Sequence, residues 1–541
     1  MYRERKREKM TSRFSGALQL TSLDDFITPS QECIKPIEIQ ASKSKTGAKI
    51  KIEEDGVPSI LNEVGQFEKL QKVEITLADC LACSGCITSA ESVLVTQQSQ
   101  EELLRVFKEK VSECQNEDGT CSKFIVVSLS VQAVLSIAKR YDLNPEQALN
   151  KLAGYFYQLG ADIVVDMTIA DDFALLESAK EFVERYKAAK GGATNQLPML
   201  SSSCPGWVCY AEKTHGNFIL PYISVTKSPQ QIMGSLVKYH LAETKGLSPE
   251  QIYHVTLMPC YDKKLEASRE DFYNAERNSR DVDCVITPIE LEQMLNEYNV
   301  TLSEVNEKEV QKPFGVQTEN LETNLCSHSG SGSGGYADFI FRYAAKYLFD
   351  ETDVIVEFKN LRNPDFQEAI FYKNEQPLLK FAIVNGFRNI QNLVQKLKRG
   401  KCPYDYVEVM ACPCGCLNGG AQIRPVDNIQ PRELALKLES MYHELPESNP
   451  EKNKAVQNLY RNWLGGEYTD KALAHFHTQY HEIKKADIAL AIKCQGKCRE
   501  NSQKVHLAKL LEASLTTILL TLVTADSNET ILNRSLWYEL I

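Results

Sequence analysis

The stretch YDYVEVMACPCGCLNGG (404–420) decides how the rest of this 541-residue sequence is interpreted. Its first half, YDYVEVMA (404–411), is a short apolar and aromatic run that is typical of a buried strand. Its second half places Cys412, Cys414 and Cys416 in a glycine-bearing turn, and glycine lets a backbone approach a bulky group closely. A strand that ends in such a turn predicts an α/β sheet with a ligand site at the carboxyl ends of its strands.

Similar strand patterns occur on both sides of the chain's middle. Apolar, β-branched runs alternate with helical patterns of ten or more residues, which indicates βαβ units and parallel sheets. The predicted strands are FIVVSLS (124–130), ADIVVD (161–166), PMLSSS (198–203), IYHVTLM (252–258), CVIT (284–287), DVIVEF (353–358) and FAIVNG (381–386). Helices are predicted near 145–159, 172–189, 229–245, 288–298 and 390–398, and again after residue 430. The polar stretch 301–335 ends in SGSGSGG, which predicts a flexible loop.

Three cysteines follow three of these strands directly. Cys204 follows PMLSSS, Cys260 follows IYHVTLMP, and Cys412 follows YDYVEVMA. Open parallel sheets place their ligands at such strand ends, so we expect these thiols to converge with Cys416 and to bind a cubane cluster. Cys414 could replace one of its two neighbours as a ligand. Any one of these cysteines alone could instead be a small buried hydrophobe.

A second cysteine group lies near the N-terminus. Cys80, Cys83 and Cys86 in DCLACSGC have the spacing of iron–sulfur ligands, with small residues between them. The position where a bacterial ferredoxin run has its fourth cysteine holds Ala90, so a fourth ligand must come from elsewhere. Cys33 in SQECIKP is the best candidate and Cys114 and Cys121 are weaker ones. Zinc is the competing interpretation, because four cysteines also satisfy a zinc ion.

Composition limits the classes of function. Hydrophobic residues make up 43% and charged residues 25% of the chain, which excludes a wholly disordered or fibrous protein. The net charge of −11 argues against a chain-wide nucleic-acid footprint. The N-terminus lacks the apolar core of a secretory signal, and the longest apolar stretch (515–525) is too short to span a membrane. The chain has 17 cysteines, and in a reducing compartment clustered cysteines indicate metal ligands or catalytic thiols rather than disulfides.

Weaker patterns do not point to a further site. Gly330-x-Gly332-x-x-Gly335 matches a dinucleotide fingerprint but lacks the strand that should precede it. The histidines of AHFHTQYHEI (474–483) read as a solvated or interfacial face. Four cysteines have no partner at ligand spacing and are interpreted as structural: Cys209, Cys284, Cys326 and Cys402. The pair Cys494 and Cys498 is left unassigned.

The cysteine-bearing segments resemble the iron-only hydrogenase family in order. The matching motifs are SSCPGWVCYAEKTHG (202–216), MPCYDKKLEA (258–267), DVDCVIT (281–287) and EVMACPCGCLNGGAQ (408–422). SGALQLTSLDDFITPSQECIKP (15–36) and DCLACSGCITSAES (79–92) resemble one branch, the nuclear prelamin A recognition factor-like proteins of cytosolic iron–sulfur assembly. This resemblance implies an α/β, iron-only hydrogenase-like fold, with two parallel-sheet βαβ lobes around a cluster and a small ferredoxin-like cluster segment before them.

The resemblance also implies cofactors, a role and partners. It implies two 4Fe–4S clusters, one on Cys33, Cys80, Cys83 and Cys86 and the other on Cys204, Cys260, Cys412 and Cys416. The implied role is that of a late adaptor or carrier in cytosolic and nuclear iron–sulfur protein assembly, without enzymatic activity. Implied partners are early scaffold proteins, apo client proteins and a targeting complex that contains a WD40 propeller protein, with no membrane and no direct nucleic acid. The expected location is the cytoplasm, with the nucleus as a second one.

Two other functions are alternatives to this role. In hydrogenases the residue before the first ligand is a cysteine that relays protons, whereas this chain has Ser203, a poorer proton donor and acceptor. The hydrogenase pattern after the last ligand runs to a third glycine, where this chain has Ala421, although Lys263 and Glu266 keep hydrogenase-like positions. A nuclear prelamin-binding protein is the third class, and the complete N-terminal ligand set favours the assembly branch over it.

The expected domain organisation follows these motifs. It comprises a flexible extension (1–14), an N-terminal cluster region (15–122), two hydrogenase-like lobes (123–300 and 301–430), a helical region (431–493) and an atypical tail (494–541). The family usually begins near Met10 and ends soon after an AD-x-ALNIKW-like segment with a terminal tryptophan. Here ADIALAIK (486–493) continues for 48 residues to WYELI. Hand-off through a terminal tryptophan is therefore in doubt for this chain, because Trp537 is not the last residue.

Overall fold

The computed structural model describes residues 50–52, 58–61, 67–69, 95, 97–114, 123–315, 324–424 and 429–483. The chain divides into two units, 1–482 and 483–541, and all described residues except 483 lie in the first unit. The proposed ligands Cys33, Cys80, Cys83 and Cys86 lie outside the described residues, as does the atypical tail (494–541). Three short strands, β1 (Ile50–Ile52), β2 (Pro58–Leu61) and β3 (Phe67–Lys69), form an antiparallel sheet.

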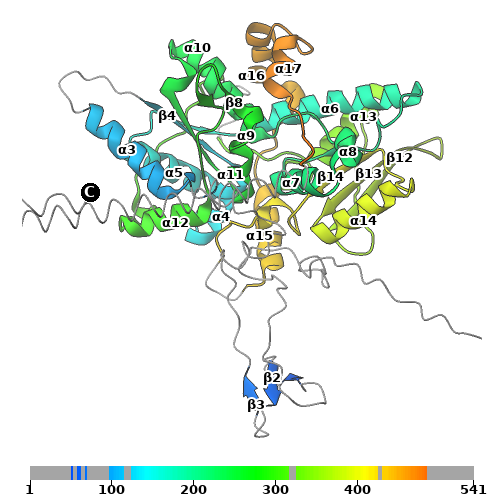
Figure 1. The fold of residues 1–541 in the computed structure, drawn as a ribbon, viewed down its shortest axis with the longest axis horizontal. Helices are drawn as coiled ribbons and strands as arrows, with labels where there is room; N and C mark the ends of the chain where they lie inside the picture. The colour runs from blue at the N-terminus through cyan, green and yellow to red at the C-terminus, as the bar shows by residue number, and fades with distance from the viewer. Residues whose placement is uncertain are drawn as a thin grey trace, which may run out of the picture. The chain divides into compact units, whose positions relative to one another are not determined.

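The first lobe is built on a four-stranded sheet in which every strand pair is parallel. Its strand order is β10 (Cys284–Ile286), β7 (Ile252–Leu257), β4 (Phe124–Leu129) and β5 (Ile163–Asp166). The strands are nearly continuous apolar runs because helices cover both faces of a parallel sheet. In Figure 1 this lobe is on the left, with α3, α5 and α12 around it. The predicted parallel sheet is confirmed here.

The second lobe is built on a five-stranded mixed sheet. Its order is β11 (Lys359–Asn360), β12 (Phe366–Lys373), β13 (Gln376–Asn385), β14 (Tyr406–Met410) and β6 (Met199–Ser201). The pairs β13–β14 and β14–β6 are parallel, whereas β12 and β13 form an antiparallel hairpin. Strand β6 comes from the PMLSSS segment, so the chain enters this sheet well before it completes the first one.

The structure differs from the predicted strands in this lobe. Residues 351–358, which include DVIVEF, form no strand, although their exposure alternates along the segment and Ile355 is 92% exposed. β12 was not predicted at all. Its polar members Gln367, Glu368 and Lys373 interrupt the apolar pattern, because this outer strand has one face toward solvent.

Helices fill both lobes. They are α3 (Gln100–Cys114), α4 (Val131–Tyr141), α5 (Pro145–Leu159), α6 (Thr168–Lys190), α7 (Pro205–Thr214), α8 (Gly216–Ile219), α9 (Pro229–Ser235), α10 (Ala242–Lys245), α11 (Asp262–Ala267), α12 (Pro288–Glu297), α13 (Tyr336–Phe349) and α14 (Phe387–Lys398). Local signals explain several bounds. α5 begins after Asn144, which forms a capping box with Gln147, and ends at Gly160 in the left-handed region. α6 is buried on nearly all sides because it packs between the two lobes.

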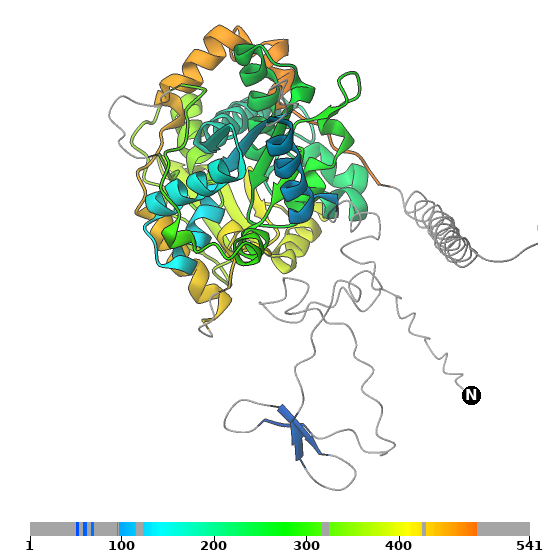
Figure 2. The ribbon, with the colours of Figure 1, turned by 90° about the vertical axis from the view of Figure 1, so that its left-hand side faces the viewer.

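The last described segment is helical, as predicted. It contains α15 (Pro431–His443), α16 (Lys454–Leu459) and α17 (Asp470–Phe476). α15 contacts α4, α16 contacts α6, and α17 contacts α9. In Figures 1 and 2, α15 lies at the opposite end of the body from α16 and α17. The segment therefore spans the body.

In the described part of the chain, no helix is long and apolar enough to cross a bilayer.

Candidate metal centre

The structure brings four of the predicted ligands to one pocket. Cys204 lies between β6 and α7, where it is the N-cap residue of the helix. Cys260 follows β7, Cys412 follows β14, and Cys416 begins the short 3-10 turn η7 (Cys416–Asn418). All four thiols line the same pocket. The convergence arises because β6 and β14 are parallel neighbours, and their carboxyl ends meet that of β7 across the two lobes.

Backbone and hydroxyl groups fix these thiols in place. The backbone N–H of Ala411 donates a hydrogen bond to Cys204 Sγ at 3.4 Å. The N–H of Cys416 donates to Ser333 Oγ at 3.0 Å, and the N–H of Cys204 donates to Ser202 Oγ at 3.0 Å. Hydrogen bonds to a ligand sulfur, and to the backbone beside it, orient a metal ligand and tune the centre that it holds.

The pocket disfavours free thiolates. Burial raises the pKa of Cys260 and of Cys412 well above the ordinary thiol value, and the neighbouring thiols raise both further. Burial, followed by the charge of Cys204, raises the pKa of Cys416 to about 12. Four negative sulfurs would be too costly in such a site without a cationic group between them. The donor set therefore suits a centre that displaces the thiol protons as it binds.

The size of the pocket tests which centre fits. Within the described ranges, no three His, Cys, Asp or Glu side chains come close enough together to hold one metal ion. A zinc ion requires its sulfurs at about 2.3 Å from one point, a condition that the four thiols do not meet. A 4Fe–4S cluster takes four cysteines. The residues present fit such a cluster better than they fit zinc.

Cys414 is placed differently from its two neighbours. Its φ is +58°, its backbone N–H donates to Asp365 Oδ1 at 2.7 Å, and it is not among the residues that line the pocket. Its thiol also interacts with Asp365, and burial is the main cause that raises its pKa, to about 12. Asp365 in turn pairs with Arg432. The turn thus directs alternate cysteines to opposite sides, and we propose Cys412 and Cys416 as the ligands.

A buried ion pair lies beside the thiols. Lys263 Nζ lies 3.1 Å from Glu266 Oε2, and both side chains are buried. Glu266 Oε1 also accepts hydrogen bonds from Ser228 Oγ at 2.5 Å and from Gln230 Nε2 at 3.1 Å. Lys263 and Ser203 both line the pocket. Lys263 is thus a fixed positive charge at the edge of an otherwise thiol-rich site.

One wall of this pocket was not predicted from the sequence. The SGSGSGG segment was expected to be a flexible loop, yet 332–335 are buried and Ser333 lines the pocket. A Cβ at Gly335 would overlap the carbonyl oxygen of Ser329, and a Cβ at Gly415 would overlap Ser333 Oγ. The glycines therefore serve close packing against the cysteine turn. A polar, glycine-rich composition alone does not distinguish such packing from a solvated loop.

The weaker sequence patterns have separate explanations. Residues 324–329 before Gly330 form no strand, in agreement with the rejection of a dinucleotide fingerprint. The histidines of 474–483 have individual partners: His475 stacks on Trp463, His477 pairs with Glu177, and His481 pairs with Asp271. They do not form a common site.

Two family models match the chain. The model described as iron-only hydrogenase large subunit, C-terminal domain, matches residues 123–420. The model described as iron hydrogenase small subunit matches residues 431–483. The first match contains all four thiols of the pocket, and the second coincides with the helical segment that spans the body.

Full-length relatives define the family more narrowly. A protein of Anopheles gambiae named "Probable cytosolic Fe-S cluster assembly factor" is 58% identical over 485 residues, which are 89% of this chain and 100% of that protein. A protein of Drosophila grimshawi with the same description is 59% identical over 484 residues, with the same shares. The chain belongs to the cytosolic Fe–S cluster assembly factor family. The predicted family resemblance is thereby confirmed.

Solved structures place this assembly factor family member on the hydrogenase fold. A variant apo FeFe-hydrogenase from Chlamydomonas reinhardtii superposes with a TM-score of 0.60 at 26% identity, over 70% of this chain and 98% of that one. A second FeFe-hydrogenase structure, which concerns oxygen inactivation at the 2Fe subcluster of the H cluster, gives a TM-score of 0.61 at 26% identity, over 71% and 98%. The predicted α/β, hydrogenase-like fold is confirmed.

Proposed function

We propose that this chain holds a 4Fe–4S cluster on Cys204, Cys260, Cys412 and Cys416 and acts as an adaptor or carrier in cytosolic iron–sulfur protein assembly. The observation that supports this most is the convergence of four thiols on one pocket between two lobes, with Cys204 buried and the other three half-buried. The relatives' names support the assembly role. The cluster, when bound, supplies iron that neutralises the four sulfurs.

The chain's own residues do the holding. Strand ends fix Cys204, Cys260 and Cys412, because side chains on a sheet framework vary less in position than side chains on loops. Gly419 lets the η7 turn lie against Pro259, next to Cys260. Met167, Met258 and Met410 supply an apolar part of the pocket wall beside the sulfurs, which favours retention of the cluster.

A hydrogenase function is less well supported. The relatives with high identity are named assembly factors, whereas the hydrogenases are matches at 26% identity. Ser203 lines the pocket at the position before the first thiol, where hydrogenases have a proton-relaying cysteine. A hydroxyl with its high pKa is a poor relay compared with a thiol. We therefore propose that the chain has no hydrogenase activity, and a hydrogen-evolution assay with a strong reductant should give no turnover.

We further propose a second 4Fe–4S cluster on Cys33, Cys80, Cys83 and Cys86. Its support is the CxxCxxC spacing and the resemblance of that segment to the assembly branch. The proposed partners are early scaffold proteins, apo client proteins and a targeting complex with a WD40 propeller protein. The proposed location is the cytoplasm, in keeping with the relatives' names, and also the nucleus.

Anaerobic purification followed by iron and sulfide analysis tests the two-cluster proposal. About eight irons per chain are expected, because each 4Fe–4S cluster holds four. Electron paramagnetic resonance of the reduced protein should report iron–sulfur centres. A yield of about four irons would contradict the second cluster.

Separate variants test the two ligand sets. Cys204→Ser should lose about four irons, and Cys83→Ser should lose the other four with little effect on the fold of the two lobes. Cys402→Ser is the matched control, because Cys402 is partly buried in the second lobe but does not line the pocket. Full iron in Cys204→Ser, or loss of iron in the control alone, would contradict the assignment.

A further inference from the structure

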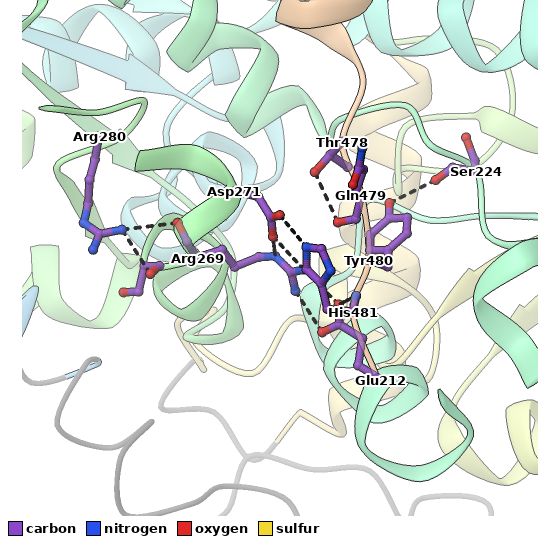
Figure 3. Close-up of polar contacts among 10 residues, drawn as sticks. Glu212, Ser224, Arg269, Asp271, Arg280, Thr478, Gln479, Tyr480 and His481 are labelled. Atoms are coloured by element: carbon purple, nitrogen blue, oxygen red, sulfur yellow. Dashed lines mark hydrogen bonds and ion pairs between the residues drawn. The ribbon is translucent and has the colours of Figure 1, made fainter. Parts of the chain in front are cut away.

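The last described residues form an extended strap (477–482) that runs back across the body. The strap pairs with the segment 224–227: the N–H of Lys227 donates to Phe476 O at 2.7 Å, and Thr478 N donates to Val225 O at 2.7 Å. Tyr480 OH donates to the carbonyl oxygen of Ser224 at 2.9 Å. Figure 3 shows this tyrosine directed toward Ser224 and His481 among charged side chains. The strap is therefore held by specific contacts and not only by chain connectivity.

Those charged side chains link the strap to the elements that bear two of the thiols. Arg269 forms a bidentate pair with Glu212, with N–O distances of 2.9 and 2.8 Å. Glu212 is buried on α7, the helix that Cys204 caps. Arg269 follows α11, the helix that begins just after Cys260. Because bidentate arginine–carboxylate pairs are strong and directional, this pair joins the Cys204 helix to the Cys260 helix.

The strap adds further contacts to this connection between α7 and α11, the α7–α11 joint. The backbone N–H of His481 donates to Glu212 Oε1 at 2.9 Å, and its ring nitrogen lies 2.8 Å from Asp271 Oδ1. Asp271 also pairs with Arg269 at 3.0 Å. The ring of Tyr480 lies 5.9 Å from the Arg269 guanidinium. Figure 3 shows Glu212, Arg269 and Asp271 gathered around His481.

A second path leads from the strap to the ion pair beside the thiols. The strap-paired segment 224–227 continues into Ser228, whose hydroxyl donates to Glu266 at 2.5 Å. Glu266 pairs with Lys263 at the edge of the pocket. Displacement of the strap would therefore leave both the α7–α11 joint and the Ser228 contact less restrained.

We propose that Arg269 and Glu212 are positioning residues for the cluster, and that strap docking and cluster retention stabilise each other. The inference rests on the proposed cluster at the four thiols. Cys204 at the start of α7 and Cys260 just before α11 would both hold the cluster, and so would restrain these two helices, whose ends carry the contacts to the strap. Linkage is reciprocal, so a docked strap slows cluster loss and a bound cluster protects the strap.

Hydrogen exchange and iron release on the full chain test this linkage. Arg269→Gln removes the bidentate pair, and His481→Pro removes the strap N–H that donates to Glu212. In both variants we expect iron loss to a chelator to accelerate by roughly tenfold, within the usual range of coupling factors. Exchange of the 477–482 amides should rise in both variants, and should rise in the wild-type chain once its iron is removed.

A matched substitution separates coupling from general destabilisation. Arg140→Gln breaks another arginine–glutamate pair, to Glu292 on α12 of the first lobe. Its iron loss should equal that of the wild-type chain. The linkage would be overturned if the variants freed the strap but lost iron at the wild-type rate. It would also be overturned if the strap amides exchanged at the same rate with and without iron. Neither outcome would contradict the proposed cluster. A wild-type chain without iron at the four thiols would overturn the proposed function itself.

Discussion

The two lobes contribute unequally to the candidate centre. The first lobe, with its all-parallel sheet, supplies only Cys260, whereas the mixed sheet of the second supplies Cys204, Cys412 and Cys416. Adjacent strands β6 and β14 hold two of the second lobe's thiols within one rigid ladder. The fourth position depends on how the lobes meet. Iron binding at such a centre therefore depends on the contact between the two lobes as well as on the ligands themselves.

Cys260→Ser should have the largest effect, because Cys260 is the one pocket thiol of the four that the first lobe supplies. We expect loss of the four irons of this site and a fall of roughly 10 °C in the unfolding midpoint. A tightly bound group contributes about 3–4 kcal/mol, and each kcal/mol shifts the midpoint of a domain of this size by about 2–4 °C. Iron analysis and a thermal scan under anaerobic conditions measure both quantities.

Cys414→Ser is the control for that variant. Cys414 lies in the same turn as two proposed ligands but interacts with Asp365 outside the pocket. It should keep its iron and its midpoint. If Cys260→Ser keeps four irons at this site while Cys414→Ser loses them, the centre belongs to the second lobe alone.

The thiol positions could be predicted from the sequence because the signal is local. A buried strand followed by a cysteine fixes where that cysteine lies once parallel sheets are assumed, and this held for Cys204, Cys260 and Cys412. The Cys414 alternative could not be resolved from spacing. It depends on a left-handed backbone at that residue and on Asp365, which lies far away in sequence.

Gly419→Ala should have the next largest effect, because it disturbs the contact between the two lobes without removing a ligand. A Cβ at Gly419 would overlap the carbonyl oxygen of Pro259, which also accepts a hydrogen bond from Ala421 N at 3.1 Å. Forcing these backbones apart costs about 1–3 kcal/mol and should displace Cys416 from Cys260. We expect partial iron loss and a midpoint that is lower by several degrees.

Gly191→Ala provides the comparison for that steric effect. Gly191 has an ordinary φ of −77°, and the nearest atom to a Cβ there is at 3.3 Å, at the exposed end of α6. This variant should retain its iron. Equal iron in both alanine variants would show that the contact between Gly419 and Pro259 does not position the ligands.

The rest of the site could not be predicted because its contacts are between distant parts of the sequence. Ser333 reaches the cysteine turn because the glycine-rich segment around it packs closely against that turn. Arg269 and Glu212 are distant in sequence and become neighbours only in the folded chain. β12 was missed because one of its faces meets solvent, and DVIVEF was predicted as a strand because it is a short apolar, β-branched run. Composition and periodicity do not encode which segments become hydrogen-bonded neighbours.

The smallest expected effect is a difference in pH dependence between the sheets. Burial lowers the pKa of His254 in β7 to about 3, so it stays neutral at working pH. Burial raises the pKa of Glu408 in β14 from 4.5 to about 7, although hydrogen bonds from Ala337 N and Ser331 lower it in part. The first sheet therefore has no titration at His254 near neutrality, whereas the second has one at Glu408.

Glu408→Gln isolates that titration. Between about pH 4.5 and 7 the folded chain keeps the Glu408 proton that the unfolded chain has lost, so stability falls as pH rises, by at most about 1.4 kcal/mol per pH unit. Glutamine stays neutral and lacks this slope. We expect the variant to match the wild-type midpoint near pH 4.5 and to exceed it progressively as the pH rises toward 7. Glu433→Gln, at an exposed position on α15, should leave the slope unchanged, and a parallel slope in Glu408→Gln would show that Glu408 does not titrate in this range.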